Sequence, residues 1–212
     1  LESLRMVLSY AVTDYPGQPK KIRDPMSPDR TQVLLIDISR AYFNAVTSDE
    51  KPTYVELQPE MGVSPGTCAL LRKHMYGTRS AAEGWQSEYS NTLRGFGFAQ
   101  GSVSARVFRH REKQLVASVH GDDFTVAGPR RSLDWFEAAM KPKYEFTIGG
   151  RLGPGAADAK EVSVLNRIVR WTSTGIEYEA DPRQVEKFLQ EIELEGANGA
   201  ATPGQKVLAH QI

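Results

Sequence analysis

The chain of 212 residues has 26 basic and 26 acidic side chains, so its formal net charge is zero. A dedicated nucleic-acid-binding domain is usually basic, and composition alone does not suggest one. The single cysteine, Cys68, excludes an intramolecular disulfide framework and a cysteine zinc cluster. No apolar run approaches the ~20 residues that span a bilayer. We therefore expect an intracellular domain with no membrane partner.

The first predicted elements are a loop and a buried strand. Residues 14–30 are rich in proline, glycine and charge, which indicates a loop. Residues 33–38 are a continuous apolar run that carries one acid, Asp37. A carboxylate inside such a run is costly unless it is paired or coordinates a metal. Asp37 therefore stands out as a candidate functional residue.

A helix is predicted for residues 79–96. Ser80 and Glu83 fit a capping box at its start. The apolar stripe of this helix recurs at every fourth position. Its members are Ala81, Trp85, Tyr89 and Leu93.

Residues 114–128 predict two strands joined by a tight turn. Apolar and β-branched residues flank a polar tip on both sides, as expected for a hairpin. The tip is His120-Gly121-Asp122-Asp123. This segment therefore places two further acids at the end of an apolar hairpin.

The remaining predicted elements are a short helix at 132–141, a hairpin formed by 161–171 and 175–179, and a last helix. Asp181 is the expected N-cap of that helix, with Pro182 at its first position. Its expected apolar face consists of Val185, Phe188, Leu189 and Ile192. Helices and antiparallel hairpins are mixed without strict alternation. This order predicts an α+β fold in which an antiparallel sheet packs on helices.

Three acids are candidates for a metal site: Asp37, Asp122 and Asp123. Clustered carboxylates repel one another unless cations neutralise them. Hard oxygen ligands suit magnesium or manganese, and two such ions can serve phosphoryl transfer. The simpler alternative is that Asp-Asp only favours the turn and that Asp37 only caps a neighbouring helix.

Basic residues lie in groups, such as Arg106, Arg109 and Arg111. The simpler interpretation of each group is a solvated face. The functional interpretation is a set of phosphate contacts along one groove.

Several segments, in order over about residues 1–204, resemble the reverse transcriptases of copia-type LTR retrotransposons. The first resembles the first catalytic motif of the family, and another stands where the family has its Tyr-x-Asp-Asp box. The segments are Asp37-Ile38-Ser39-Arg40-Ala41-Tyr42-Phe43-Asn44, Tyr54-Val55-Glu56-Leu57-Gln58-Pro59, residues 71–85, Gly95-Phe96-Gly97-Phe98, Val119-His120-Gly121-Asp122-Asp123, Val164-Leu165-Asn166 and Thr202-Pro203.

The resemblance implies a right-hand polymerase palm with partial fingers and the start of a thumb-like helix at the C-terminus. Palm and partial fingers would span residues 1–150. The hairpin that grips the primer and the thumb-like helix would span 151–204, followed by a tail at 205–212. The implied activity is RNA-directed DNA polymerisation, and the implied location is the cytoplasm or a virus-like particle, or the nucleus. The implied partners are an RNA template, a DNA primer, deoxynucleoside triphosphates, and the integrase and ribonuclease H of the same polyprotein.

The resemblance also implies roles for single residues. Asp37, Asp122, Asp123 and the Ile38 carbonyl would hold two Mg²⁺ ions, for which Mn²⁺ could substitute. The nucleotide-binding residues would be Tyr42, which excludes a ribose 2′-hydroxyl, together with Arg79 and Ser80. The primer- and template-binding residues would be His120, Gly121, Leu165 and Asn166.

The sequence departs from the family pattern at several positions. Ser80 replaces the usual glutamine, Ala82 replaces proline, and His120 replaces tyrosine. Thr147 stands where these enzymes often have lysine, so a general acid for pyrophosphate would have to be Lys141 or Lys143.

Three alternatives remain open on sequence grounds. Gly-Asp-Asp is also the signature of RNA-dependent RNA polymerases, although Tyr42 occupies the gate region here. A decayed or co-opted retrotransposon domain would bind nucleic acid without catalysis. A metal-dependent nuclease would share the acids but would have no use for Tyr42.

Overall fold

A six-stranded antiparallel sheet is the centre of the computed structural model, which describes residues 2–48, 50, 52–180 and 182–197. Its strands lie side by side in the order β4 (Ala99–Gln100), β5 (Val107–His110), β6 (Leu115–His120), β7 (Asp123–Pro129), β1 (Thr31–Ile38) and β8 (Phe146–Leu152). Together with four α-helices and two smaller antiparallel sheets, it gives the described residues a mixed α+β architecture. The predicted fold class and the predicted strands at 33–38 and 114–128 are therefore confirmed.

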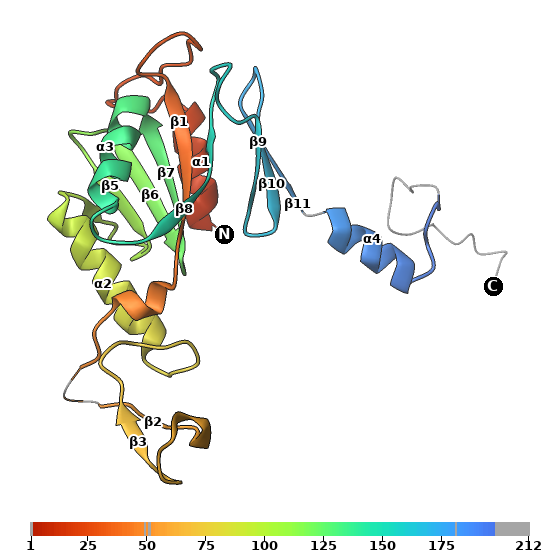
Figure 1. Ribbon diagram of the computed structural model, residues 1–212. Helices are drawn as coiled ribbons and strands as arrows, with labels where there is room; N and C mark the ends of the chain where they lie inside the picture. Colours follow the sequence, from red (N-terminus) through yellow and green to blue (C-terminus); the bar gives the residue numbers. More distant parts are fainter. Residues whose placement is uncertain (1, 49, 51, 181, 198–212) are drawn as a thin grey trace.

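Helices cover both faces of this sheet, as Figure 1 shows. Leu34, Ile36 and Ile38 of β1 belong to a core shared with α2 (Ala81–Gly95) and α3 (Arg130–Met140). Val33 and Leu35 belong to a second core, on the face covered by α1 (Glu2–Val12). Burial on both faces explains why the sequence of β1 is continuously apolar rather than alternating.

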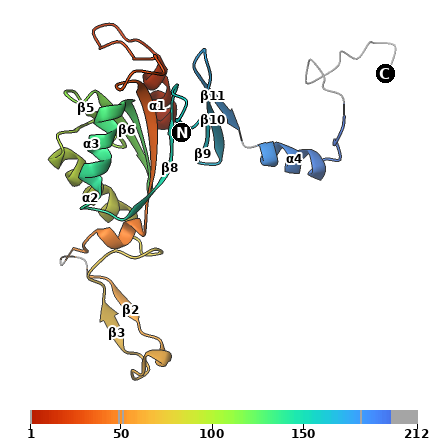
Figure 2. The same ribbon diagram turned by 45° about the horizontal axis from the view of Figure 1, so that its top comes forward.

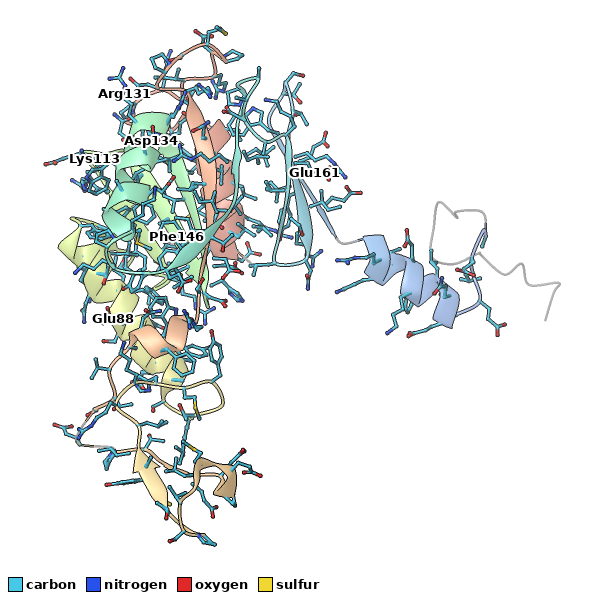
Figure 3. The ribbon with its side chains drawn as sticks, viewed as in Figure 1. Glu88, Lys113, Arg131, Asp134, Phe146 and Glu161 are labelled. Carbon is cyan, nitrogen blue, oxygen red and sulfur yellow. The ribbon has the colours of Figure 1, made fainter. Side chains whose placement is uncertain are left out.

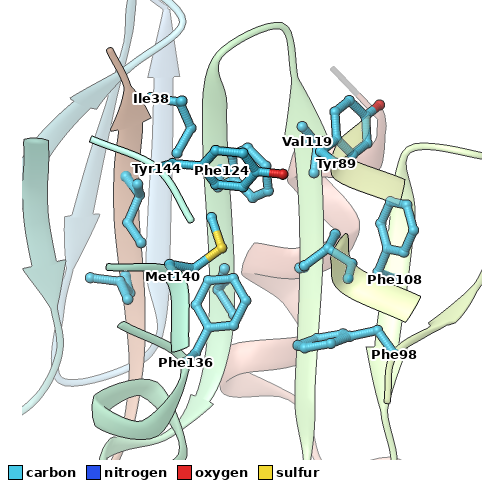
Figure 4. Packing of buried hydrophobic residues seen from close by; sticks show 14 of the residues in the cluster. Ile38, Tyr89, Phe98, Phe108, Val119, Phe124, Phe136, Met140 and Tyr144 are labelled. Atoms are coloured by element: carbon cyan, nitrogen blue, oxygen red, sulfur yellow. The ribbon is translucent and has the colours of Figure 1, made fainter. Parts of the chain in front are cut away.

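The core beneath α2 and α3 is rich in aromatic rings (Figure 4). Tyr89 makes edge contacts with Phe108 and Phe124, with ring centroids 6.0 Å and 5.8 Å apart. Phe136 and Met140 of α3 are fully buried beside them. Burial of each such side chain contributes roughly 1.5–3 kcal/mol. The stripe predicted from residues 79–96 and the helix predicted at 132–141 are confirmed.

The capping box predicted at Ser80 and Glu83 is wrong. Ser80 is the N-cap residue of α2, but it has φ −90° and ψ −2° and makes no side-chain capping bond. Its Oγ instead lies 3.5 Å from Nδ1 of His74, which is buried. The tertiary contact with His74 has therefore replaced the local one.

A three-stranded sheet packs on the α1 side of the molecule. Its strands are β9 (Glu161–Val164), β10 (Arg167–Trp171) and β11 (Ile176–Ala180), with β10 in the middle. The single strand predicted for 161–171 is wrong, because Leu165 and Asn166 form a turn inside it, both with positive φ (48° and 58°). Two successive positive φ values are the requirement of a type I′ hairpin turn, which usually uses Asn-Gly.

Two parts project from the sheets (Figure 2). One is the hairpin of β2 (Tyr54–Glu56) and β3 (Cys68–Leu70), with the short 3-10 helix η2 (Pro59–Met61) at its end. The other is α4 (Pro182–Glu191), whose predicted apolar residues Val185 and Phe188 are exposed. The predicted N-cap Asp181 and the Thr202-Pro203 segment lie outside the described residues. Among the described helices, none is long and apolar enough to cross a membrane.

Buried and surface ion pairs join the loops to the sheet. Arg30 donates from Nε and Nη2 to the Asp158 carboxylate at 2.7 Å and 2.6 Å. Gln32 donates a third hydrogen bond to Asp158, so that the loop after β8 is held against β1. Asp134, labelled on α3 in Figure 3, pairs with Arg151 of β8 at 2.5 Å.

Candidate metal and nucleotide site

Four polar residues lie directly opposite one another at one end of the central sheet. His120 of β6 pairs with Asp123 of β7, Asp123 pairs with Asp37 of β1, and Asp37 pairs with Thr147 of β8. Directly opposed residues share one face of a sheet, with Cβ atoms about 5 Å apart. Because side chains alternate along a strand, Asp37 is on the same face as Val33 and Leu35, the α1 side.

Asp122 comes to this row through the turn between β6 and β7. Gly121 has a φ of +65°, as the first central position of a type II′ turn requires. The indole Nε1 of buried Trp85 donates to the Gly121 carbonyl at 2.7 Å. The Ile38 N–H donates to the Asp122 carbonyl at 3.0 Å. Two core residues thus fix the backbone of the turn and hold Asp122 beside the end of β1.

The three carboxylates influence one another electrostatically. Burial raises the pKa of Asp123 above its ordinary value, and the charges of Asp122 and Asp37 raise it further, while His120 acts in the opposite direction. Asp122 and Asp123 are half-buried, and Asp37 is exposed. Negative charge is therefore concentrated at this end of the sheet, where a bound cation would relieve the repulsion.

The donor set fits a hard divalent cation in its chemistry. Carboxylate oxygens are the ligands that Mg²⁺ and Mn²⁺ prefer. Within the residues that the structure describes, however, no group of three or more His, Cys, Asp or Glu side chains has the arrangement of a metal site. Asp37, Asp122 and Asp123 are electrostatic neighbours at this end of the sheet.

Tyr42 lies in the turn that follows β1, the strand that carries Asp37. It lies in the 3-10 helix η1 (Ala41–Asn44), which begins after Arg40 in the left-handed conformation, with φ 52°. The Asn44 side chain donates to the carbonyls of Ala41 and Arg40 at 3.2 Å and 3.3 Å, which stabilises this tight turn. Tyr42 is half-buried and packs against the main core, while the neighbouring Phe43 is 41% exposed. The turn thus places Tyr42 beyond the end of β1, four residues after Ile38.

Arg79 and Ser80, the other two predicted nucleotide-binding residues, lie at the start of α2. Arg79 is exposed in the loop before α2. Ser80 lines a cavity of about 380 Å³ together with His74, Gly84 and Glu88. The residues that line this cavity include none of the three carboxylates. The structure thus does not bring Ser80 to the acids.

The predicted primer-binding residues are partly brought together. A small pocket of about 30 Å³ is lined by His120, Asp123, Leu165 and Arg106, among others. Leu165 reaches this pocket from the β9–β10 turn, and His120 reaches it from the end of β6. Gly121 is exposed at the neighbouring turn, and Asn166 is exposed outside the pocket.

Neither predicted lysine lies in that pocket. Lys141 forms an ion pair with Glu137 at 2.9 Å, at the end of α3. Lys143 lines a separate cavity with Glu88 and Thr92 of α2. The residue directly beside Asp37 on β8 is Thr147, whose hydroxyl is a poor proton donor compared with an ammonium group.

A larger cavity lies away from the acids. It measures about 450 Å³ and is lined by Arg23, Lys160 and Trp171, among others. These residues lie near the Thr31 end of β1, whereas Asp37 lies near the other end. None of the predicted site residues lines this cavity.

Sequence reasoning missed three residues of the site. Trp85 was predicted only as part of an apolar stripe, yet its indole N–H holds the acidic turn. Arg106 was only one member of a basic group, yet it lines the pocket with Asp123. Tyr76 received no role, although its ring centroid lies 4.4 Å from that of Tyr42. An aromatic residue before Gly77, within the segment that resembles the family, is the signal that could have indicated Tyr76.

Comparison with known proteins adds no family to this description. No protein-family model matches the chain, and no curated protein matches it.

Proposed function

We propose that this chain is the RNA-directed DNA polymerase domain of a copia-type retrotransposon polyprotein. The proposal depends on one observation above all: two strands and one turn gather Asp37, Asp122 and Asp123 at the same end of the sheet. Like charges at opposed positions destabilise a sheet, and a metal-dependent reaction gives that arrangement a use.

In this proposal the three carboxylates and the Ile38 carbonyl would hold two Mg²⁺ ions, for which Mn²⁺ could substitute. Such ions would supply activation of the primer 3′-hydroxyl and neutralisation of the triphosphate charge. Tyr42 excludes a ribose 2′-hydroxyl, and exposed Arg79 meets the triphosphate. His120, Gly121 and the Leu165-Asn166 turn bind the primer end. Ser80 retains no assigned contact with the nucleotide, because it packs on His74.

The architecture supplies counterparts for the parts of such a domain. The six-stranded sheet with α2 and α3 would be the palm, and the projecting β2–β3 hairpin would be part of the fingers. The hairpin that grips the primer would be the β9–β10 turn, and α4 would begin a thumb. The partners would be an RNA template, a DNA primer and the integrase and ribonuclease H of the polyprotein.

The test is extension of a DNA primer on an RNA template with deoxynucleotides, comparing the chain with its Asp122→Asn variant. We expect extension by the unaltered chain and at least a hundredfold loss in the variant, on the scale of losing one electrostatic contact to the transition state. Circular dichroism should show that the variant is folded, because the contacts that fix the turn use the backbone of Gly121 and Asp122.

The opposite outcome has a specific meaning. If the unaltered chain binds an RNA–DNA duplex in a salt-sensitive manner but does not extend the primer, the polymerase proposal fails for this chain. Binding that is also indifferent to Mg²⁺ would favour a nucleic-acid-binding relic. Equal extension by the Asp122→Asn variant would remove the two-metal assignment.

A further inference from the structure

Tyr76 forms an aromatic cluster with Tyr42 and Phe43, the two aromatic residues that follow β1. Its ring centroid lies 4.4 Å from that of Tyr42, at an interplanar angle of 57°. It also makes an edge contact with Phe43, at 5.9 Å and 69°. Tyr76 comes from the loop between β3 and α2, so this contact joins two segments that are distant in the sequence.

A tight turn presents Tyr76 to this cluster. The Thr78 N–H and hydroxyl both donate to the Met75 carbonyl, at 3.1 Å and 2.8 Å. Gly77 has a φ of +85°, which the third position of a type II turn requires. Tyr76 therefore occupies the second position of a doubly closed turn, and its backbone is held in place independently of its side chain.

The phenol of Tyr76 is also close to the carboxylates. Partial burial raises its pKa, and the negative charges of Asp122 and Asp37 add to this effect. Close to half of the residue (47%) is nevertheless exposed. Tyr76 thus stands at the rim of the carboxylate site, in contact with Tyr42 on one side and solvent on the other.

An aromatic gate must hold its ring in one position, because it discriminates between two sugars that differ by a single oxygen atom. Tyr42 is in a helix of four residues and is only partly buried where it packs against the main core. Tyr76 provides a ring contact with Tyr42 and is itself in contact with Phe43. Without Tyr76, the Tyr42 ring would gain rotamers that move it out of the path of a 2′-hydroxyl.

We propose that Tyr76 is a positioning residue that fixes the Tyr42 ring and thereby sets the discrimination between deoxyribonucleotides and ribonucleotides. This inference rests on the proposed polymerase function. It rests on the ring of Tyr76, because the contacts with Tyr42 and Phe43 are ring contacts, while the hydroxyl interacts with the Ala41 backbone.

The experiment measures kcat/KM for a deoxynucleotide and for the matching ribonucleotide in Tyr76→Ala, Tyr76→Phe, Tyr42→Ala and the Tyr42→Ala/Tyr76→Ala double variant. We expect Tyr76→Ala to lower the preference for deoxynucleotides on the order of tenfold, the scale of one lost steric contact. Tyr76→Phe should keep the preference of the unaltered chain. In the double variant, Tyr76→Ala should add nothing, because its effect acts through Tyr42.

Tyr15→Ala is the matched control. Tyr15 is similarly exposed, at 39%, and stacks on another tyrosine ring, Tyr10, at 6.4 Å. It lies in the loop after α1 and has no part in the carboxylate site. Its removal should leave the sugar preference unchanged.

Two results would overturn the inference while the polymerase proposal stands. One is an unaltered deoxynucleotide preference in Tyr76→Ala. The other is that Tyr76→Ala lowers this preference in the Tyr42→Ala background by as much as it does alone. Absence of extension by the unaltered chain would overturn both the proposed function and this inference. The two failures are therefore distinguishable in the same assay.

Discussion

Asp37 and Asp123 are directly opposed residues of two hydrogen-bonded strands, β1 and β7. Like charges in this relationship destabilise a sheet by repulsion, and partial burial of Asp123 adds to the cost. Replacement of either acid by a neutral residue would give a more stable sheet. We infer that the carboxylates are suited to a cation-dependent reaction rather than to stability.

The first prediction concerns the stability of Asp123→Asn. Its thermal unfolding midpoint without divalent cations at pH 7 should equal or exceed that of the unaltered chain, because a raised pKa means that the folded state disfavours the ionised form. The gain should be small, because solvent screens a half-exposed group. Asp134→Asn is the control of opposite sign, since Asp134 pairs with Arg151 at 2.5 Å. A marked loss of stability in Asp123→Asn would show that the acid has a structural partner.

The second prediction concerns Tyr42→Ala, which should admit ribonucleotides while deoxynucleotide addition remains largely intact. Tyr42 is half-buried in the turn that follows β1, and in the proposed function its ring meets a 2′-hydroxyl. Single-nucleotide incorporation with each sugar measures the effect. Unchanged sugar selectivity in Tyr42→Ala would show that Tyr42 does not exclude ribonucleotides.

The third prediction concerns Gly84 in α2. A Cβ at this position would lie 2.1 Å from Nε2 of His74, whose ring is buried. Gly84→Ala must therefore displace His74, and we expect a loss of about 2 kcal/mol in the free energy of unfolding.

Gly95→Ala in the same helix is the control for Gly84→Ala. A Cβ at Gly95 would meet nothing within 4 Å, and alanine is the better helix former. Urea denaturation should therefore show a neutral or stabilising effect. Equal behaviour of the two variants would mean that His74 moves aside at no cost.

The fourth prediction concerns acid unfolding. Hydrogen bonds from Arg30, Gln32 and the Gly155 N–H lower the pKa of Asp158 from 3.8 to about 2. The lowered pKa contributes about 2 kcal/mol of stability above pH 4, which is lost as the pH falls from about 4 to about 2. Asp158→Asn should be less stable at pH 7 and should lack this pH dependence. A pH profile that is the same in both proteins would contradict this assignment.

Much of the fold followed from hydrophobic periodicity. The strand at 33–38, the stripe from Ala81 to Leu93 and the hairpin around Gly121 have long or regular apolar patterns, and each was predicted. The expectations did not include α1, β8 or β2 to β5, of which β2 to β5 are short strands of two to four residues. The formation of a short strand depends more on pairing with neighbouring strands than on its own sequence.

The errors have local physical causes. The β9–β10 turn escaped notice because Leu165 adopts positive φ without a glycine, against its intrinsic preference, beside Asn166, which tolerates positive φ. The capping box failed because Ser80 contacts His74 across a loop. The acids of the site could be identified from the sequence, because a carboxylate within an apolar run is energetically costly. Tyr76 could not be identified in this way, because its role depends on a contact with Tyr42, which is 34 positions away in the sequence.

The most direct test of the central claim is the dependence of primer extension on divalent cations. The reaction is run on an RNA template with deoxynucleotides, in Mg²⁺, in Mn²⁺ and with a chelator, beside the Asp123→Asn variant. We predict extension in either metal, no extension with the chelator, and no extension by the Asp123→Asn variant although it is folded. Extension that survives the chelator, or that Asp123→Asn retains, would contradict the carboxylate metal site.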